Sequence, residues 1–157
     1  MKKQKGFSLI ELLIVVAIIL IIAAIAIPNL LKAKMAANES SAVGSIRTIN
    51  TGEVTYAAGC PNIGYSATLI ELNTGAICAS GIGIIDNVLS TGQKSGYTFT
   101  YTPGAAAANG VVSTYTNVAV PLTVGTTGQR GFYSDQTGVI RYTLAGAAPT
   151  VASSALQ

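Results

Sequence analysis

The chain has 157 residues, of which half are hydrophobic and only 10% are charged, and it contains no His and no Trp. This composition excludes ordinary intrinsic disorder, which requires low hydrophobicity. The lack of His, with only two Cys, largely excludes zinc sites, His general bases and Cys–His catalytic pairs. The formal charge of +3 would favour an acidic partner such as nucleic acid or a membrane surface, depending on where the charges lie.

The first predicted element is a long helix whose N-terminal half is almost entirely apolar. The apolar stretch runs from Phe7 to Leu31, interrupted only by Ser8, Glu11, Pro28 and Asn29. About 25 helical residues span about 37 Å, which is enough to cross a bilayer core of about 30 Å. Three lysines precede the stretch, so the positive-inside rule places this end in the cytoplasm and exports the rest of the chain.

Three interpretations of this segment remain open on the residues alone. It could be a cleaved secretory signal with Ala24-Ile25-Ala26 near its end, a plain membrane anchor, or a helix that serves both as anchor and in assembly. Glu11 bears on the choice, because a carboxylate in a membrane helix costs about 2.5–3.5 kcal/mol at the centre and less near the end. Neither a signal peptide nor an inert anchor needs this residue, although its carboxylate could simply reach the lipid headgroups.

The segment from Lys5 to Ile19, KGFSLIELLIVVAII, resembles the prepilin leader and N-terminal helix of type IV pilins and type II secretion pseudopilins. The resemblance covers about the first 35 residues. It implies that residues 1–6 are a leader which a prepilin peptidase removes between Gly6 and Phe7, and that the new amine of Phe7 is methylated. It also implies that Glu11 pairs with the terminal amine of a neighbouring subunit, and that an assembly ATPase and an inner-membrane platform protein take part.

Elementary electrostatics supports the role that the resemblance gives to Glu11. Removal of the leader creates a cation at Phe7, and a carboxylate one helical turn away is a suitable counter-ion. In a filament core of low dielectric constant an unpaired charge is costly. The pair would therefore favour correctly docked neighbours and set the register of assembly.

The helix is expected to continue beyond the apolar stretch to about Tyr56. Pro28 predicts a kink or local melting near residues 24–28, because it lacks an N–H and clashes with the preceding turn. Beyond it an apolar stripe recurs at spacings of three and four residues: Leu31, Met35, Ala42, Val43, Ile46 and Ile49. Other positions are polar: Lys32, Lys34, Asn38, Glu39 and Arg47. A helix over residues 7–56 would be roughly 75 Å long, so part of it has to protrude into a membrane or a bundle of helices.

A globular head is predicted over residues 57–157. It opens with a loop-rich connector over residues 57–92, with short helices at 68–72 and 84–90. Cys60 and Cys78 in an exported chain indicate one disulfide, which would close a loop of about 19 residues and contribute about 3 kcal/mol. A redox site would prefer CxxC spacing, and a metal site lacks further ligands. Many type IV pilins place their disulfide near the C-terminus instead.

From Gly96 onward the period of the sequence changes to two, which is typical of strands. Strands are predicted at residues 97–101 and 112–120, and a hairpin joins 129–134 to 139–144 around a turn at 135–138. The result is a meander of three or four antiparallel strands with one face on the helix, and a tail over 145–157 that frays. The fold class is α+β, a pilin-like fold with a long N-terminal helix and a small antiparallel head. The stretches 96–102 and 125–142 also look like the heads of pseudopilin-related proteins.

The head offers no constellation of catalytic or metal-binding residues. Its acids beyond residue 56 are Glu71, Asp86 and Asp135, and they form no DxD or EF-hand pattern. A calcium site near Asp135 would lack ligands. We therefore expect no enzyme activity, no metal and no cofactor.

The leading functional hypothesis is a type IV pilin that polymerises through its N-terminal helix into an extracellular filament for adhesion, motility or DNA uptake. The precursor would reside in the inner membrane. The alternatives are a type II secretion pseudopilin in a short periplasmic filament, and a membrane-anchored binding module that never polymerises. Removal of residues 1–6 deletes three lysines and leaves six basic and six acidic side chains, so the initial positive charge no longer indicates a nucleic-acid partner.

Overall fold

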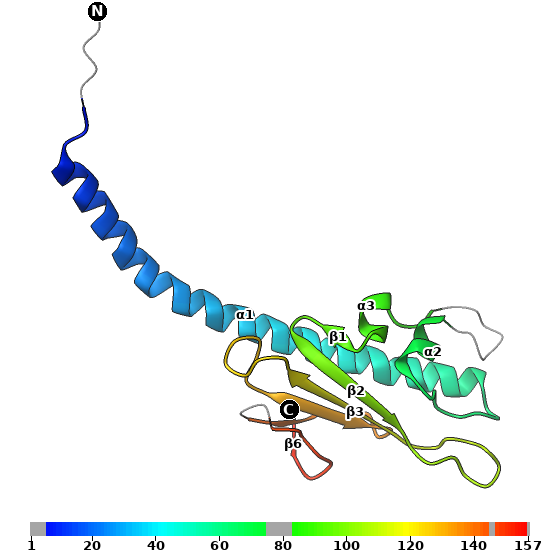
Figure 1. Cartoon of the computed structure of the whole chain (residues 1–157). Helices are drawn as coiled ribbons and strands as arrows, with labels where there is room; N and C mark the ends of the chain where they lie inside the picture. The colour runs from blue at the N-terminus through cyan, green and yellow to red at the C-terminus, as the bar shows by residue number, and fades with distance from the viewer. Residues whose placement is uncertain (1–5, 75–82, 145–146, 157) are drawn as a thin grey trace, which may run out of the picture. The chain divides into compact units, whose positions relative to one another are not determined.

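The computed structural model describes residues 6–74, 83–144 and 147–156. The elements within these residues follow one another as shown in Figure 1: α1 (Leu9–Gly59), α2 (Leu69–Thr74), α3 (Asn87–Ser90), β1 (Gln93–Lys94), β2 (Tyr97–Pro103), β3 (Tyr115–Pro121), β4 (Gly131–Asp135), β5 (Arg141–Thr143) and β6 (Ser154–Ala155). The chain divides into two compact units, Met1–Lys34 and Met35–Gln157, which we call the N-terminal unit and the head. The head in this sense is larger than the predicted globular head over residues 57–157, because it includes the second half of α1. The boundary between them falls inside α1. The order of helix and then antiparallel strands confirms the α+β, pilin-like fold class.

Helix α1 is 51 residues long and passes through Pro28 without a break. Of the two predicted outcomes near residues 24–28, local melting is absent, and a kink at Pro28 stays a prediction. The helix begins two residues later than predicted and ends three residues later, at Gly59. The backbone N–H of Cys60 still donates to the Tyr56 carbonyl (2.9 Å), which extends the helical hydrogen bonds to the start of the connector.

In the head, one face of α1 is buried and the opposite face is exposed. Most of the buried positions repeat at spacings of three and four residues, the pattern of a helix that packs along one side: Glu39, Ala42, Ile46, Ile49, Glu53 and Tyr56. Ser45 and Gly52, each next to one of these residues, are also buried. Ala42, Ile46 and Ile49 confirm part of the predicted stripe, whereas Met35 and Val43 are half-buried and Leu31 is exposed. The assignment of Glu39 to the polar face is wrong. Glu39 takes a core-facing position because a specific set of donors in the head receives its carboxylate, as described below.

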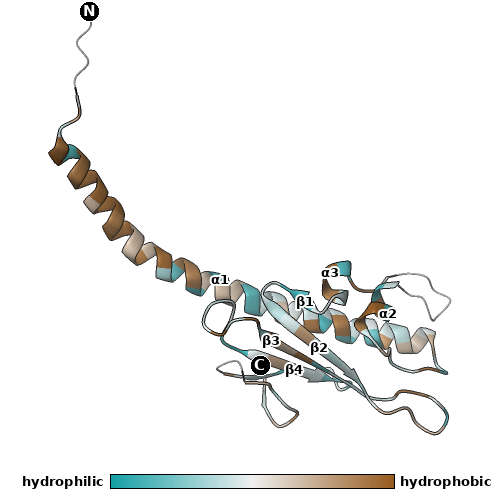
Figure 2. Ribbon diagram, viewed as in Figure 1, coloured by the Kyte–Doolittle hydropathy of each residue, from teal (hydrophilic) through white to brown (hydrophobic). Residues whose placement is uncertain are grey.

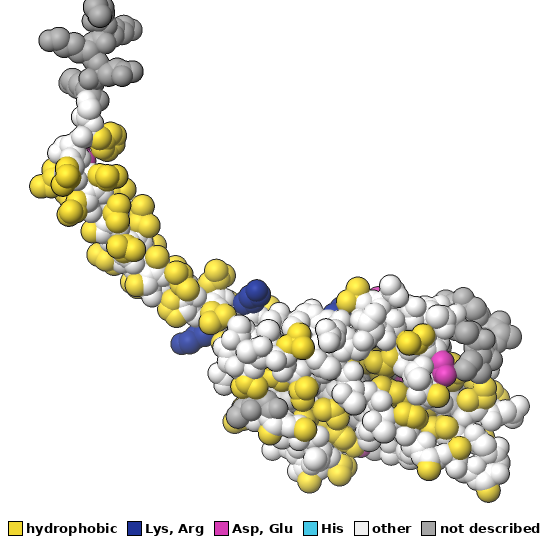
Figure 3. All heavy atoms as spheres, viewed as in Figure 1, with side chains coloured by type: hydrophobic (Ala, Val, Ile, Leu, Met, Phe, Trp, Pro, Cys, Tyr) yellow, Lys and Arg dark blue, Asp and Glu magenta, His cyan; other side chains and the backbone are white. Residues whose placement is uncertain are grey.

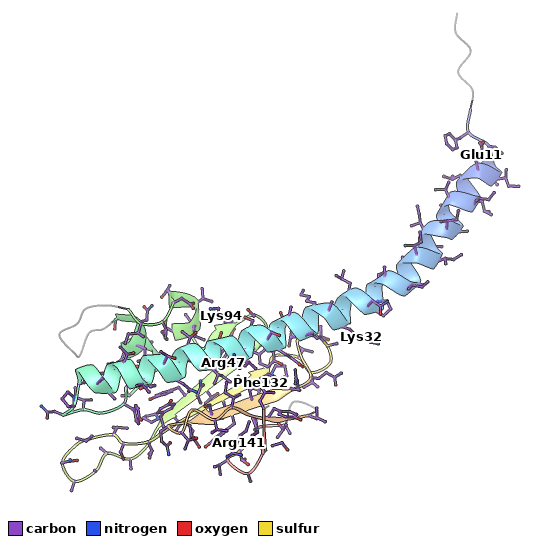
Figure 4. The ribbon with its side chains drawn as sticks, turned by 180° about the vertical axis from the view of Figure 1, so that it is seen from behind. Glu11, Lys32, Arg47, Lys94, Phe132 and Arg141 are labelled. Carbon is purple, nitrogen blue, oxygen red and sulfur yellow. The ribbon has the colours of Figure 1, made fainter. Side chains whose placement is uncertain are left out.

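The sheet contains six strands in sequence order, and every neighbouring pair is antiparallel. Side chains of β3 alternate between buried and half-buried, as the period of two predicts. Phe99, Ala119 and Phe132 are register partners on adjacent strands, and all three are buried in one core with Ile46 and Ile49 of α1. Figure 4 labels Phe132 within the head. The meander predicted from the sequence is thus present, although it is larger than expected.

Two short edge strands were not predicted. β1 pairs with β2, and β6 pairs with β5 near the C-terminus. The prediction that residues 145–157 fray is wrong for residues 147–156, because the Leu156 N–H donates to the Ile140 carbonyl (2.7 Å) and Arg141 donates to the Ser153 carbonyl (3.1 Å). A strand of two residues carries too little pattern to be recognised from sequence, and only pairing with a neighbour defines it.

The hairpin between β4 and β5 forms where its turn residues predict it. Gly138 has φ +74°, which a residue without Cβ adopts readily, and its N–H donates to the Asp135 carbonyl (2.9 Å). The Asp135 side chain accepts from the Thr137 N–H (2.9 Å), which closes the turn locally.

The connector contains α2 and α3, which correspond to the two short helices predicted at 68–72 and 84–90, although α3 is shorter. Cys60 is buried in the core. Cys78 lies outside the described residues, so the Cys60–Cys78 disulfide stays a prediction.

Candidate functional site

The apolar half of α1 carries its hydrophobic side chains on every side. All large hydrophobic residues from Leu9 to Leu31 are exposed in the isolated chain. Figure 2 shows this part of the ribbon in nearly continuous brown, and Figure 3 shows the same stretch coated in yellow. By length and composition α1 can cross a membrane, although a signal sequence near an N-terminus satisfies the same criterion. Such a surface requires a lipid bilayer or other apolar helices around it.

The helix begins with half of a capping box. Ser8 precedes the first helical residue, and its backbone N–H donates to Glu11 Oε2 (2.9 Å). This is the reciprocal bond of the Ser-x-x-Glu pattern, and it explains why the helix begins at Leu9 rather than at Phe7. The carboxylate also lies at the positive end of the helix dipole. In the isolated chain Glu11 therefore stabilises the start of its own helix (Figure 4).

The predicted processing residues lie immediately before this cap. Phe7 is 83% exposed, and a Cβ built on Gly6 would meet no described atom within 4 Å. The peptide bond between them is thus unobstructed by the described part of the chain. Glu11 follows Phe7 by four residues, about one helical turn. The structure thereby brings Gly6, Phe7 and Glu11 into one short exposed segment, while Pro28 and Cys60 lie elsewhere in the chain.

The first buried acid in the head, Glu39, binds the loop between β3 and β4. Its Oε1 accepts from the backbone N–H groups of Gln129 (2.8 Å) and Arg130 (3.1 Å), and its Oε2 accepts from Arg130 Nε (2.7 Å). Burial by itself raises the pKa of Glu39, but the hydrogen bonds from Gln129 and Arg130 outweigh it, so this pKa lies below its usual value. The Arg130 guanidinium also lies 5.6 Å from the Phe132 ring centre and 5.7 Å from that of Tyr142.

The second buried acid, Glu53, has no cationic partner among the described residues. It is fully buried and accepts from the Ser66 backbone N–H (2.9 Å) and from the Ser66 hydroxyl (2.6 Å). Burial raises the pKa of Glu53, and the two bonds from Ser66 offset only part of this effect. Tyr101 donates to the Ser66 carbonyl (2.9 Å), so the same contact connects α1, the connector and β2.

Glu39 and Glu53 were not recognised as important positions from the sequence. They lie 14 residues apart, which is close to four helical turns, and therefore on one face of α1 with Ile46 and Ile49. This spacing is the signal that could have identified them. Acids that interrupt an apolar stripe at core positions indicate buried acceptors with donors opposite.

The remaining acids of the head show no arrangement suited to catalysis or metal binding. Asp86 caps α3 by accepting from the Leu89 N–H (2.9 Å) and pairs with Lys94 (2.7 Å) at the surface. Within the described residues no group of three or more His, Cys, Asp or Glu side chains could hold a metal ion.

Comparison with known proteins matches the N-terminal segment that contains Gly6, Phe7 and Glu11. A family model described as the prokaryotic N-terminal methylation motif matches residues 1–27. The chain is similar to the type IV wide pilus major component PilA4 of Thermus thermophilus, with 62% identity over 40 residues. It is also similar to the type IV major pilin protein PilA of Myxococcus xanthus, with 44% identity over 54 residues.

These matches cover a limited part of each chain. They span 26% and 34% of this chain, and 30% and 24% of the two relatives. No solved structure matches the chain.

Proposed function

We propose that this chain, whose N-terminal segment is that of the type IV pilin family, is a structural subunit that polymerises through α1 into an extracellular pilus filament. The observation that carries the proposal is the apolar half of α1, exposed on every side and bearing one carboxylate in its first turn. The helix would be a membrane anchor in the precursor and part of a helical core in the filament. Both relatives are named as pilus components, which favours a pilus over a secretion pseudopilus.

Processing would prepare the helix for assembly. A prepilin peptidase would cleave between Gly6 and Phe7 and methylate the Phe7 amine, and the exposed position of both residues supports access to this bond. The new cation would then lie about one turn from Glu11. An assembly ATPase and an inner-membrane platform protein would move subunits from the inner membrane into the filament.

Glu11 would exchange partners during assembly. In the isolated chain its carboxylate accepts from the Ser8 N–H. In the filament it would pair with the methylated amine of a neighbouring subunit, because a charge-assisted bond in a water-free core is stronger than a bond to a neutral amide. Adhesion, motility or DNA uptake would be uses of the assembled filament.

The experiment separates the charge of Glu11 from its capping role. Gln also serves at this position of a capping box, so Glu11→Gln keeps the helix start and removes only the charge. We expect Glu11→Gln to reduce filaments in sheared surface material at least tenfold by electron microscopy and immunoblotting, since a lost ion pair in an apolar core costs several kcal/mol. Mass spectrometry should show that wild type and variant both start at Phe7 with one added methyl group.

Two results would contradict the proposal. Normal filaments from Glu11→Gln would reduce Glu11 to a helix cap and favour a membrane-anchored module that does not polymerise. A mature chain that retains Met1, or that begins after Ala26, would exclude processing as a prepilin.

A further inference from the structure

The loop between β3 and β4 holds two apolar side chains in solvent. Leu122 is 54% exposed and Val124 is 50% exposed, and residues 121–129 contain no charged side chain. The loop is closed by its own hydrogen bonds: the Thr127 N–H donates to the Thr123 carbonyl (2.9 Å), and the Gly125 N–H donates to the Gly128 carbonyl (2.9 Å). Leu122 and Val124 are therefore displayed by a defined turn.

This loop lies at the end of the head where α1 enters. Asn38 of α1 donates through Nδ2 to the Thr127 carbonyl (2.8 Å), and the Leu122 N–H donates to the Gly96 carbonyl (3.0 Å). Asn38 directly precedes Glu39, the first buried residue of α1. The exposed apolar pair is thus attached to the first part of α1 that contacts the head.

Chain length brings this end of the head close to any membrane that α1 crosses. Asn38 follows Leu31, the end of the apolar stretch, by seven residues. This separation corresponds to about 10 Å of helix and at most about 25 Å of extended chain. The headgroup layer is itself roughly 5–8 Å thick on each side of the bilayer core. Asn38, which holds the loop, is therefore separated from the end of the apolar stretch by no more than about 25 Å of chain.

The residues of α1 between Leu31 and Asn38 include two positive charges that an anionic lipid surface attracts. Lys32 and Lys34 are both exposed, and neither forms an ion pair with a described residue. Figure 3 shows dark blue side chains where the yellow coat of α1 ends. The carboxylate nearest in sequence, Glu39, is neutralised by Arg130. Cationic side chains and exposed apolar side chains are the features with which proteins bind at the membrane interface.

We infer that the loop Leu122–Thr127 is a membrane contact of the unassembled subunit. Leu122 and Val124 rest in the headgroup layer, and Lys32 and Lys34 pair with anionic lipid phosphates. The inference rests on the membrane-anchored precursor of the proposed function. The contact holds the head at the membrane surface until extraction into the filament breaks it.

Because the chain contains no Trp, a single introduced Trp can serve as a fluorescent reporter of contact with lipid. Val124→Trp introduces this reporter into the loop. Val88→Trp places the matched control reporter, because Val88 has similar exposure (56%) but lies on α3. Each full-length variant is reconstituted at high lipid excess in phosphatidylcholine vesicles containing phosphatidylglycerol. Lipids brominated near the headgroup then quench any indole that reaches this layer.

We expect quenching of the loop reporter to be several-fold stronger than that of the control reporter, with a blue-shifted emission. Quenching should fall in vesicles of phosphatidylcholine alone, and with Lys32→Gln combined with Lys34→Gln. Leu122→Trp should reproduce the result for Val124→Trp and guards against a local folding defect in either variant.

Equal quenching of the loop and control reporters would overturn the inference. So would quenching of the loop reporter that disappears as the chain is diluted in lipid, because that behaviour indicates contact between copies. Equal quenching in neutral and anionic vesicles would overturn the role of the lysines. Flotation of the vesicles on a density gradient shows whether the chain is anchored in the bilayer. If the chain floats with the vesicles but the loop reporter is unquenched, this inference alone is refuted. If the chain does not float, the membrane anchor of the proposed function is contradicted.

Discussion

Helix α1 places the same residue types in two opposite environments. Ile18 in the N-terminal unit is 51% exposed, whereas Ile46 in the head is fully buried. The difference follows from patterning: around Ile18 all sides of the helix are apolar, and around Ile46 only one stripe is. A helix that is apolar all round requires a surrounding apolar medium, while an amphipathic helix finds its partner within its own chain. One continuous helix thereby has an apolar half that is exposed in the isolated chain and an amphipathic half that packs within the head.

The largest expected effect separates these two environments directly. Ile46→Ala should destabilise the head by about 2–5 kcal/mol, because it leaves a cavity in the core. Ile18→Ala should change the stability of the head by less than about 0.5 kcal/mol, because Ile18 belongs to the N-terminal unit and its side chain is 51% exposed. Urea unfolding of the detergent-solubilised chain, followed by the circular dichroism of the sheet, measures both. Similar losses of stability from the two variants would show that both parts of α1 contribute equally to the stability of the head.

A smaller loss of stability is expected when Glu39, which connects α1 to the segment before β4, loses its charge. Glu39→Gln should cost about 1–3 kcal/mol at neutral pH, since two backbone N–H groups and a half-exposed Arg130 lose a charged acceptor. The pKa of Glu39 is lowered in the folded state. The advantage of wild type is therefore present above the ordinary carboxyl value of 4.5, and it is lost as the pH falls through the folded-state pKa.

Urea midpoints over a pH series measure this difference. Lys94→Gln is the control, because its ion pair with Asp86 is exposed and should contribute less than about 0.5 kcal/mol. If Glu39→Gln lowered the free energy of unfolding as little as Lys94→Gln does, the ion pair between Glu39 and Arg130 would contribute no more than a surface contact.

The smallest effect concerns Glu53, whose pH dependence should have the opposite sign. Burial raises the pKa of Glu53, so its contribution to stability is full below 4.5 and is lost as the pH rises through the folded-state pKa. As the pH rises from acid to neutral, wild type should therefore lose stability relative to Glu53→Gln. The expected change in the difference between their free energies of unfolding is on the order of 1 kcal/mol. The same pH series measures it. Parallel curves for Glu53→Gln and wild type would refute the assignment.

Much of the fold followed from patterns that repeat over many residues. Several residues in succession indicate the same environment in each of three patterns: the apolar stretch, the stripe around Ile46 and Ile49, and the alternation along β2 and β3. The turn at Gly138 was also identified, because its conformation follows from residue type alone. The edge strands β1 and β6 were missed, since two residues hold no period and their order depends on a neighbouring strand.

The segment at the N-terminus was recognised for a different reason. Gly6, Phe7 and Glu11 lie within six residues, so local sequence contains the whole candidate site and no folding is needed to assemble it. The bond from the Ser8 N–H to Glu11 lies within the same turn. The Cys60–Cys78 pairing also came from sequence, and it stays a prediction.

Neighbours along the chain were enough to predict where the apolar stretch lies, where the helix and main strands form, and which short segment contains the proposed processing and assembly residues. These properties depend on neighbours along the chain. The surroundings of the two acids on the core face of α1 became known from the tertiary structure alone. Glu39 meets donors about 90 residues later in the chain, and Glu53 meets Ser66 in the connector. A buried carboxylate is stabilised or penalised by the groups that surround it in space, and the sequence does not show which groups those are.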